Sequence, residues 1–123
     1  SGKHEYLGGI ILPGFGISLR VLHEKTALLP AVRLNKPGSL IGKNTKSSIL
    51  SGIVYGYASL IGGLLSLLKK DKLLHNAKVI GTGGDIDFIK KYCRKFNNID
   101  GNLTLKGLCL LYEKTLKERG NLQ

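Results

Sequence analysis

The sequence contains no tryptophan and no methionine, and it has only two cysteines and three prolines. Because no methionine stands at position 1, we expect that the chain does not begin at a natural start, and that the residues upstream of Ser1 were cut away or belong to a separate chain. Two cysteines are too few for a cysteine-based metal site, which needs more ligands at suitable spacing. Cys93 and Cys109 lie in helical patterns beside apolar residues. We therefore predict two reduced core thiols in a cytosolic protein, and no metal site.

Acidic residues are also scarce, with 8 against 19 Lys and Arg, so the formal net charge is +11. A basic chain can bind nucleic acid, an anionic membrane or a phosphorylated ligand. Here the lysines are scattered, aromatic residues make up 7%, and no known nucleic-acid-binding module is present. We expect a solvated basic surface without a nucleic-acid partner. The three histidines, His4, His23 and His75, are isolated in the sequence. No set of residues has the pattern of a catalytic site.

The stretch from Asn44 to Lys70 organises the chain, since no charged residue lies between Ser47 and Leu68. Apolar residues recur there at the spacing of one helix face. Small residues form a second stripe within an arc of roughly 80°. We call this the small stripe, and its members are Ser48, Gly52, Gly56, Ser59, Gly63 and Ser66. Asn44 or Thr45 is expected to cap the helix.

Three interpretations of this helix are open. It is a central helix buried on two sides, or it also packs its small stripe on the same helix of a symmetric partner. Its length and flanking lysines also fit a membrane span. Five serines and four glycines dilute its hydrophobicity, so we favour a buried helix and no membrane partner.

Strands and helices alternate along the chain, which favours an α/β fold in one domain. The expected elements are a buried strand over Glu5–Leu12, a helix from Pro13 to Thr26, an extended stretch Ala31–Leu34, a loop Asn35–Lys43, the long helix, a strand Ala77–Gly81, a helix to Phe96, a link Asn98–Asp100 and a helix from Thr104 to Glu118. The last helix is expected to face the core through Leu105, Leu108, Cys109, Tyr112 and Leu116. These strands are too few for a stable sheet, so we expect the chain to complete its sheet with residues outside it.

A glycine-rich turn, Thr82-Gly83-Gly84, follows the second expected strand and precedes a helix that Asp85 or Asp87 can cap. Such a turn leaves backbone N–H groups free to meet a nucleotide. It lacks the P-loop Lys-Ser/Thr and the spacing of a dinucleotide-binding fingerprint. A simple tight turn fits the pattern equally well.

Four segments in register resemble the C-terminal half of type III pantothenate kinase, a family that includes the Bvg accessory factor-like proteins. They are Tyr6-Leu7-Gly8-Gly9-Ile10-Ile11-Leu12-Pro13-Gly14; Thr26-Ala27-Leu28-Leu29-Pro30; Ile41-Gly42-Lys43-Asn44-Thr45 with Ser51-Gly52-Ile53-Val54-Tyr55-Gly56-Tyr57; and Thr82-Gly83-Gly84 with Leu103-Thr104-Leu105-Lys106-Gly107-Leu108. Order and spacing match over nearly the whole chain.

The resemblance implies that residues 1–123 are part of a C-terminal domain with the actin-like, ribonuclease H-like fold of acetate and sugar kinases, Hsp70 and actin, incomplete at its N-terminal strands. It implies a cytoplasmic, homodimeric enzyme that phosphorylates pantothenate with ATP, the first step of coenzyme A biosynthesis. It also implies a divalent and a monovalent cation, whose ligands are not in this chain.

The resemblance also implies roles for six residues. Thr26 would contact pantothenate near the dimer interface, and Gly83 and Gly84 would lie near the adenosine end of the nucleotide. The three glycines that would line the cleft are Gly8, Gly9 and Gly14. No catalytic residue and no metal ligand is assigned to this chain.

Departures from the family pattern limit what the chain is expected to do alone. The family's aspartate-bearing phosphate loop, its catalytic aspartate and its Gly-Thr-Ala phosphate segment are absent from these 123 residues. We therefore expect the chain to be inactive without a missing N-terminal half or a separate chain. The alternative is a non-catalytic accessory or regulatory relative that binds a partner.

Overall fold

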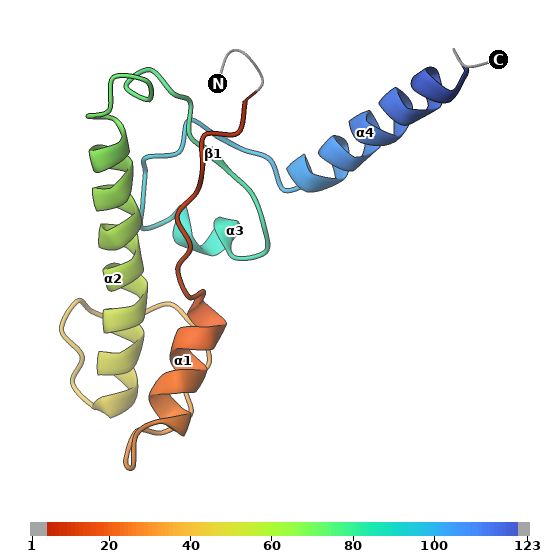
Figure 1. Ribbon diagram of the computed structural model, residues 1–123. Coiled ribbons are helices and arrows are strands. Elements are labelled where there is room, and N and C mark those ends of the chain that lie inside the picture. The colour runs from red at the N-terminus through yellow and green to blue at the C-terminus, as the bar shows by residue number, and fades with distance from the viewer. Residues whose placement is uncertain (1–4, 121–123) are drawn as a thin grey trace. The chain divides into compact units, whose positions relative to one another are not determined.

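The computed structural model describes residues 5–120, with side chains as far as Glu118 (Figure 1). The chain divides into two compact units, Ser1–Ile53 and Val54–Gln123, and the boundary falls inside the longest helix, α2. A single domain was predicted over residues 1–123. Of that range, residues 1–4 and 121–123 lie outside the described residues. The class is α/β with a small parallel sheet, in agreement with the sequence.

Helix α2 spans Thr45–Leu68, close to its predicted extent. Asn44 is its cap, because the Asn44 side-chain Oδ1 accepts a hydrogen bond from the Ser47 N–H at 3.0 Å. Ser47 Oγ in turn accepts from the backbone N–H groups of Lys43 and Asn44, each at 3.0 Å. These reciprocal bonds satisfy donors that a helix start leaves without intrahelical partners. The predicted cap is therefore confirmed at Asn44.

In the first unit, residues 5–14 form no strand, so the prediction of a buried strand over Glu5–Leu12 is wrong for this chain. Ile11 is 96% exposed and Tyr6 is 87% exposed. The reason is physical: a strand needs a partner for its backbone groups, and no segment of the described residues pairs with this one.

Helix α1 spans Phe15–Glu24 and begins after Gly14, which is extended at φ −79° and ψ 172°. Phe15 and Leu19 are buried, one helical turn apart. The helix ends two residues before the predicted Thr26. Just beyond the helix end, the Thr26 Oγ1–H donates to the Leu22 carbonyl at 2.5 Å. This bond satisfies one of the carbonyls that have no intrahelical partner at a helix C-terminus.

The loop between α1 and α2 packs closely on the first turn of α2. Ser51 is buried, and its hydroxyl donates to the Leu40 carbonyl. Gly42 lies so near the helix that a Cβ there would overlap the backbone N and Cα of Ser48 and lie 2.6 Å from the carbonyl carbon of Ser47. The loop thus requires glycine at position 42 for space.

Replacing Gly42 by alanine is expected to lower the free energy of unfolding by about 3 kcal/mol. The added methyl forces the loop away from α2, which combines overpacking strain of ~1–3 kcal/mol with loss of the Asn44 cap at ~1 kcal/mol. Urea unfolding followed by circular dichroism measures the change. Gly38→Ala in the same loop is the matched control, because a Cβ there meets nothing within 4 Å. Equal losses for both variants would contradict the steric explanation.

The second unit contains a parallel β1–α3–β2 arrangement. Strand β1 (Ile80–Gly81) pairs with β2 (Asn98–Ile99) in the register Ile80 to Asn98 and Gly81 to Ile99. Helix α3 (Ile86–Ile89) connects them and is shorter than predicted, because regular α-helix ends at Ile89 instead of Phe96. Its residues Ile86 and Ile89 are buried, and so is Cys93 just after it.

Helix α4 spans Leu103–Gly120 and begins one residue before the predicted cap Thr104. The prediction that it faces a core is wrong for the described residues, because all five named positions are exposed: Leu105, Leu108, Cys109, Tyr112 and Leu116. Only Cys93 of the two predicted core thiols is buried, and it lies outside regular helix; both cysteines are free. These side chains of α4 therefore lie at the surface of the described chain.

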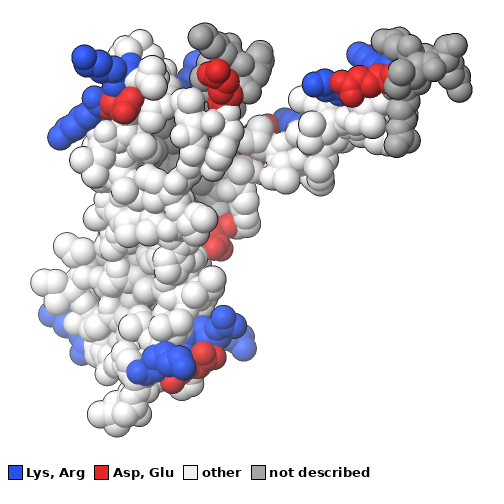
Figure 2. All heavy atoms as spheres, viewed as in Figure 1, with Lys and Arg blue, Asp and Glu red and all other residues white. Residues whose placement is uncertain are grey.

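The small stripe of α2 is open at its glycines, whereas Ser66 at its end is half-buried and accepts a hydrogen bond from Lys95 Nζ. A Cβ at Gly52, Gly56 or Gly63 would meet nothing within 4 Å, so burial of the helix on two sides is not found among the described residues. The face of α2 seen in Figure 2 carries no charged atoms between the helix ends. Helix α2 is long and apolar enough to cross a membrane, but a core helix passes the same test.

Candidate functional site

The glycine-rich turn predicted to meet a nucleotide follows β1 in the second unit. Gly83 has φ +98°, a conformation that residues with a side chain rarely adopt. A Cβ at Gly83 or Gly84 would meet nothing within 4 Å, so the backbone on this side of the turn is open. The turn closes by a bond from the Ile86 N–H to the Gly83 carbonyl at 3.4 Å.

The strand beneath this turn is tightly packed. Gly81 is buried, and a Cβ there would lie 2.7 Å from Cγ1 of Ile86 and 3.2 Å from Cδ1 of Phe96. Gly81 therefore lets α3 approach β1 closely. The combination is a closely packed strand end followed by an open glycine turn, an arrangement suited to the approach of a ligand to the backbone.

Thr26 lies in the first unit, just after α1, and is exposed. Its hydroxyl donates to the Leu22 carbonyl, so it keeps acceptor capacity for another group. Nearby, His23 Nδ1 donates to the Leu29 carbonyl at 2.8 Å, which ties the end of α1 to the following segment. The predicted pantothenate contact is thus an accessible side chain on a hydrogen-bonded helix end.

The glycines predicted to line the cleft precede α1. Gly8 has φ +115°, and a Cβ at Gly9 would lie 2.9 Å from the hydroxyl oxygen of Tyr6. Gly14 is the N-cap residue of α1. These residues and Thr26 belong to the first unit, whereas Gly83 and Gly84 belong to the second. The predicted site therefore consists of two separately described parts.

The first unit also has an apolar hollow of about 350 Å³ beside α1. Its lining residues are Gly16, Leu19, Arg20, His23 and residues 31–34. Arg20 Nε lies 3.9 Å from Glu24 Oε1, so its charge is partly balanced. The hollow was not predicted from the sequence.

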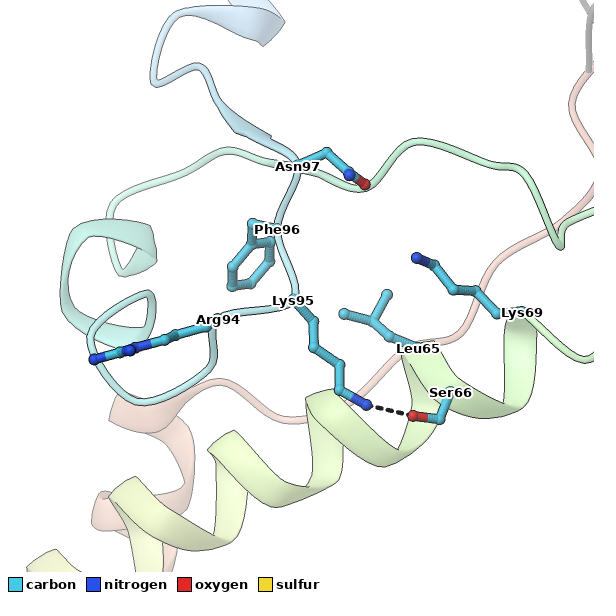
Figure 3. Close-up of a pocket in the computed structure, with 7 residues that line it drawn as sticks. All are labelled: Leu65, Ser66, Lys69, Arg94, Lys95, Phe96 and Asn97. Carbon is cyan, nitrogen blue, oxygen red and sulfur yellow. Dashed lines mark hydrogen bonds between the residues drawn. The ribbon is translucent and has the colours of Figure 1, made fainter.

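A second cavity, of about 330 Å³, lies between the end of α2 and the segment leading into β2 (Figure 3). We call it the cationic pocket, and its lining residues are Leu65, Ser66, Lys69, Arg94, Lys95, Phe96 and Asn97. Lys95 Nζ donates to Ser66 Oγ and, at 3.0 Å, to the Gly62 carbonyl. This cluster was not predicted from the sequence, because its cations come from two distant segments.

Carboxylates in the described residues serve local roles. Lys106 Nζ donates to Asp100 Oδ2 at 2.7 Å, and this side-chain hydrogen bond lowers the pKa of Asp100. A side-chain hydrogen bond from Lys90 likewise lowers the pKa of Asp87. Within residues 5–120, no three His, Cys, Asp or Glu side chains gather in a group that could hold a metal ion.

The histidines form no nucleophile pair in the described part of the chain. His75 Nδ1 donates to the Lys72 carbonyl at 2.8 Å, as His23 does to Leu29. His4 lies outside the described residues. Both described imidazoles thus hold backbone turns.

Comparison with known proteins gives the family. The sequence model of type III pantothenate kinase matches residues 1–67. The chain is 42% identical over 114 residues to the type III pantothenate kinase of Anaeromyxobacter sp. (strain K), covering 93% of this chain and 44% of that protein. The enzyme of that name from Shouchella clausii (strain KSM-K16) is 39% identical over 112 residues, 91% of this chain and 44% of the relative.

A third relative, the type III pantothenate kinase of Syntrophobacter fumaroxidans (strain DSM 10017 / MPOB), is 42% identical over 118 residues. That match covers 95% of this chain and 45% of the relative. The chain thus spans less than half the length of the curated relatives it matches. With the family model matching more than half of its residues, the chain belongs to the type III pantothenate kinase family.

Proposed function

We propose that the chain is part of a pantothenate kinase that transfers a phosphoryl group from ATP to pantothenate, the first step towards coenzyme A. The observation that carries the proposal is identity of 42% over 93% of the chain to a protein of that name. The proposal is tested by assaying pantothenate phosphorylation with the chain alone and with the chain joined to the remainder of the family's length.

The proposed fold is a C-terminal domain of the actin-like, ribonuclease H-like type, lacking N-terminal strands. Two features support it. The β1–α3–β2 unit is a parallel crossover of the kind that builds such sheets. Residues 6–12 are rich in apolar side chains that are exposed, and they form no strand within the described residues, as expected of a strand whose neighbours lie outside the chain.

The proposed role of Gly83 and Gly84 is to let the nucleotide approach the backbone near its adenosine. The positive φ of Gly83 and the open space at both glycines support this role. Gly8, Gly9 and Gly14 are proposed to line a cleft where the chain enters α1.

Thr26 is proposed to contact pantothenate close to the interface of a homodimer. Its exposure and its position at a hydrogen-bonded helix end support this assignment. The open small stripe of α2 supports a symmetric helix-to-helix interface, because close approach of two helices needs residues without bulky side chains.

In an active assembly that contains the chain, Thr26→Ala is expected to raise the KM for pantothenate about tenfold with little change in kcat. The loss corresponds to one hydrogen bond of ~1 kcal/mol or slightly more that binds substrate and transition state equally. Thr26→Ser keeps the hydroxyl and is the control. Steady-state kinetics with varied pantothenate measure both variants. A threonine that acts only by capping α1 would leave KM unchanged.

Phosphoryl transfer needs phosphate contacts and metal ions that position the reacting atoms. The described acidic residues do not gather in a metal-binding group, so they do not fit the divalent and monovalent cations that the family resemblance implies. We propose that these ligands and the catalytic aspartate lie in the part of the family's length that this chain does not span. We also propose a cytoplasmic location, without a membrane or nucleic-acid partner.

A second candidate function is a non-catalytic accessory protein that binds a partner. The exposed apolar residues of α4 and of residues 5–14 favour a chain that has a binding partner, whatever its chemistry. The two functions are distinguished by assaying pantothenate phosphorylation after the chain has been combined with the remainder of the family's length.

A further inference from the structure

The cationic pocket has an unbalanced charge. Lys69, Arg94 and Lys95 line it, and no acidic residue does. The ammonium group of Lys95 already has partners on α2. Its Nζ donates to the Gly62 carbonyl and to Ser66 Oγ, near the negative end of the helix dipole. No ion pair or side-chain hydrogen bond of Lys69 or Arg94 is found among the described residues. The charges of Lys69 and Arg94 are therefore not balanced by another side chain within the described residues.

The remaining lining adds a fixed donor and an apolar wall. Asn97 Oδ1 accepts from the Val79 N–H at 2.8 Å, which orients the side chain and leaves both N–H groups of its amide Nδ2 as donors for other groups. Figure 3 shows Lys69 and Leu65 extending from α2 toward Phe96 and Asn97, whereas Arg94 extends away from α2 at the rim. Donors at one side and apolar side chains beside them match a ligand with an anionic group and a short apolar part.

The pocket is separate from the glycine turn. Its residues Arg94–Asn97 directly precede β2, whereas Gly83 and Gly84 follow β1. Because the strands are parallel, their amino ends share one edge of the pair and their carboxyl ends share the other. The pocket and the turn therefore lie at opposite ends of the strands.

We propose that the cationic pocket binds a small phosphate monoester, with the phosphate at Lys69 and Asn97 and the apolar group against Leu65 and Phe96. A dianionic phosphate accepts from several donors at once and balances more charge than a carboxylate. The volume of about 330 Å³ suits a small organic molecule. The site is independent of the catalytic role proposed above.

The test uses the 123-residue chain labelled with ¹⁵N and titrated with inorganic phosphate and with phenyl phosphate at fixed ionic strength. Saturable shifts are expected for the amide signals of Lys69, Lys95 and Asn97, with phenyl phosphate binding more tightly. Signals of Gly83 and Gly84 should stay in place. Shifts that do not saturate, or shifts centred on the glycine turn, would overturn the proposal.

Matched variants separate the pocket from the general positive charge of +11. Lys69→Gln is expected to weaken phenyl phosphate binding about fivefold, and Lys70→Gln, next to it but outside the lining, less than about twofold. Because Arg94 extends away from the other lining side chains, Arg94→Gln is expected to weaken binding less than about twofold, as is Lys91→Gln. These side chains are exposed, so circular dichroism should confirm an intact fold. Equal weakening by Lys69→Gln and Lys70→Gln would mean that no site exists.

Discussion

The 123-residue chain alone is expected to show no pantothenate-dependent turnover of ATP, and joining it to the rest of the family's length is expected to raise the rate at least ~10³-fold. The chain spans about 44% of its relatives, and its described acidic residues form no metal-binding group. Phosphoryl transfer depends on positioned charges around the phosphate. A chain without them has little means of stabilising the transition state.

The experiment supplies the missing part from the Anaeromyxobacter relative, either as a separate chain or as a fusion. Pantothenate phosphorylation is followed with radiolabelled pantothenate, which avoids background from contaminating ATPases. The control is the same assembly with the catalytic aspartate of the added part replaced by asparagine, which should remain at background. Turnover by the chain alone would contradict the prediction.

The accessory function gives a different outcome in the same assay. An assembly that forms a stable complex, as seen by size-exclusion chromatography, yet remains without turnover would favour a binding role. The exposed apolar residues of α4 and of residues 5–14 are expected to become protected in either case. Hydrogen exchange therefore reports assembly, and only catalysis distinguishes the two functions.

Local signals in the sequence predicted local structure well. Helix α2 was expected over Asn44–Lys70 and is found over Thr45–Leu68, because its periodic apolar pattern is long and Asn44 provides a side-chain cap. The turn at Gly83 was expected from its glycines and is found with a positive φ. In both cases, neighbours in sequence determine the conformation.

Predictions that needed a distant partner were wrong for this chain. Residues 5–12 have the composition of a buried strand, and α4 has the apolar spacing of a packed helix, yet both are exposed. Composition shows that a segment can be buried but does not supply the surface that buries it. Strand β1 is also shorter than predicted. It is two residues long, and the strand that pairs with it, β2, has only two residues.

The residues proposed to bind ligands divide in the same way. The glycines of the turn could be predicted because strand, turn and helix are contiguous in sequence. The cationic pocket could not, because Lys69 and residues 94–97 meet only after the second unit has folded. Scattered lysines were interpreted as a solvated surface, and only the fold reveals which of them share a cavity.

Replacing Gly56 by leucine is expected to raise the dissociation constant of the proposed homodimer at least about 100-fold. Gly56 is exposed at the centre of the small stripe, and a Cβ there meets nothing within its own chain. Overpacking a close contact costs ~1–3 kcal/mol, and a two-fold interface repeats the cost in both copies. Leucine is a better helix former than glycine, so α2 itself should not be weakened.

Sedimentation velocity across micromolar concentrations measures the effect, with a shift from dimer to monomer expected for Gly56→Leu. Gly107→Leu is the control, because it makes the same change in α4, outside the small stripe, where a Cβ also meets nothing within 4 Å. A dimer that survives Gly56→Leu at low concentration would place the interface elsewhere. If both variants dissociated equally, added bulk on any exposed helix would explain the result, and the small stripe would lose its assignment as the dimer face.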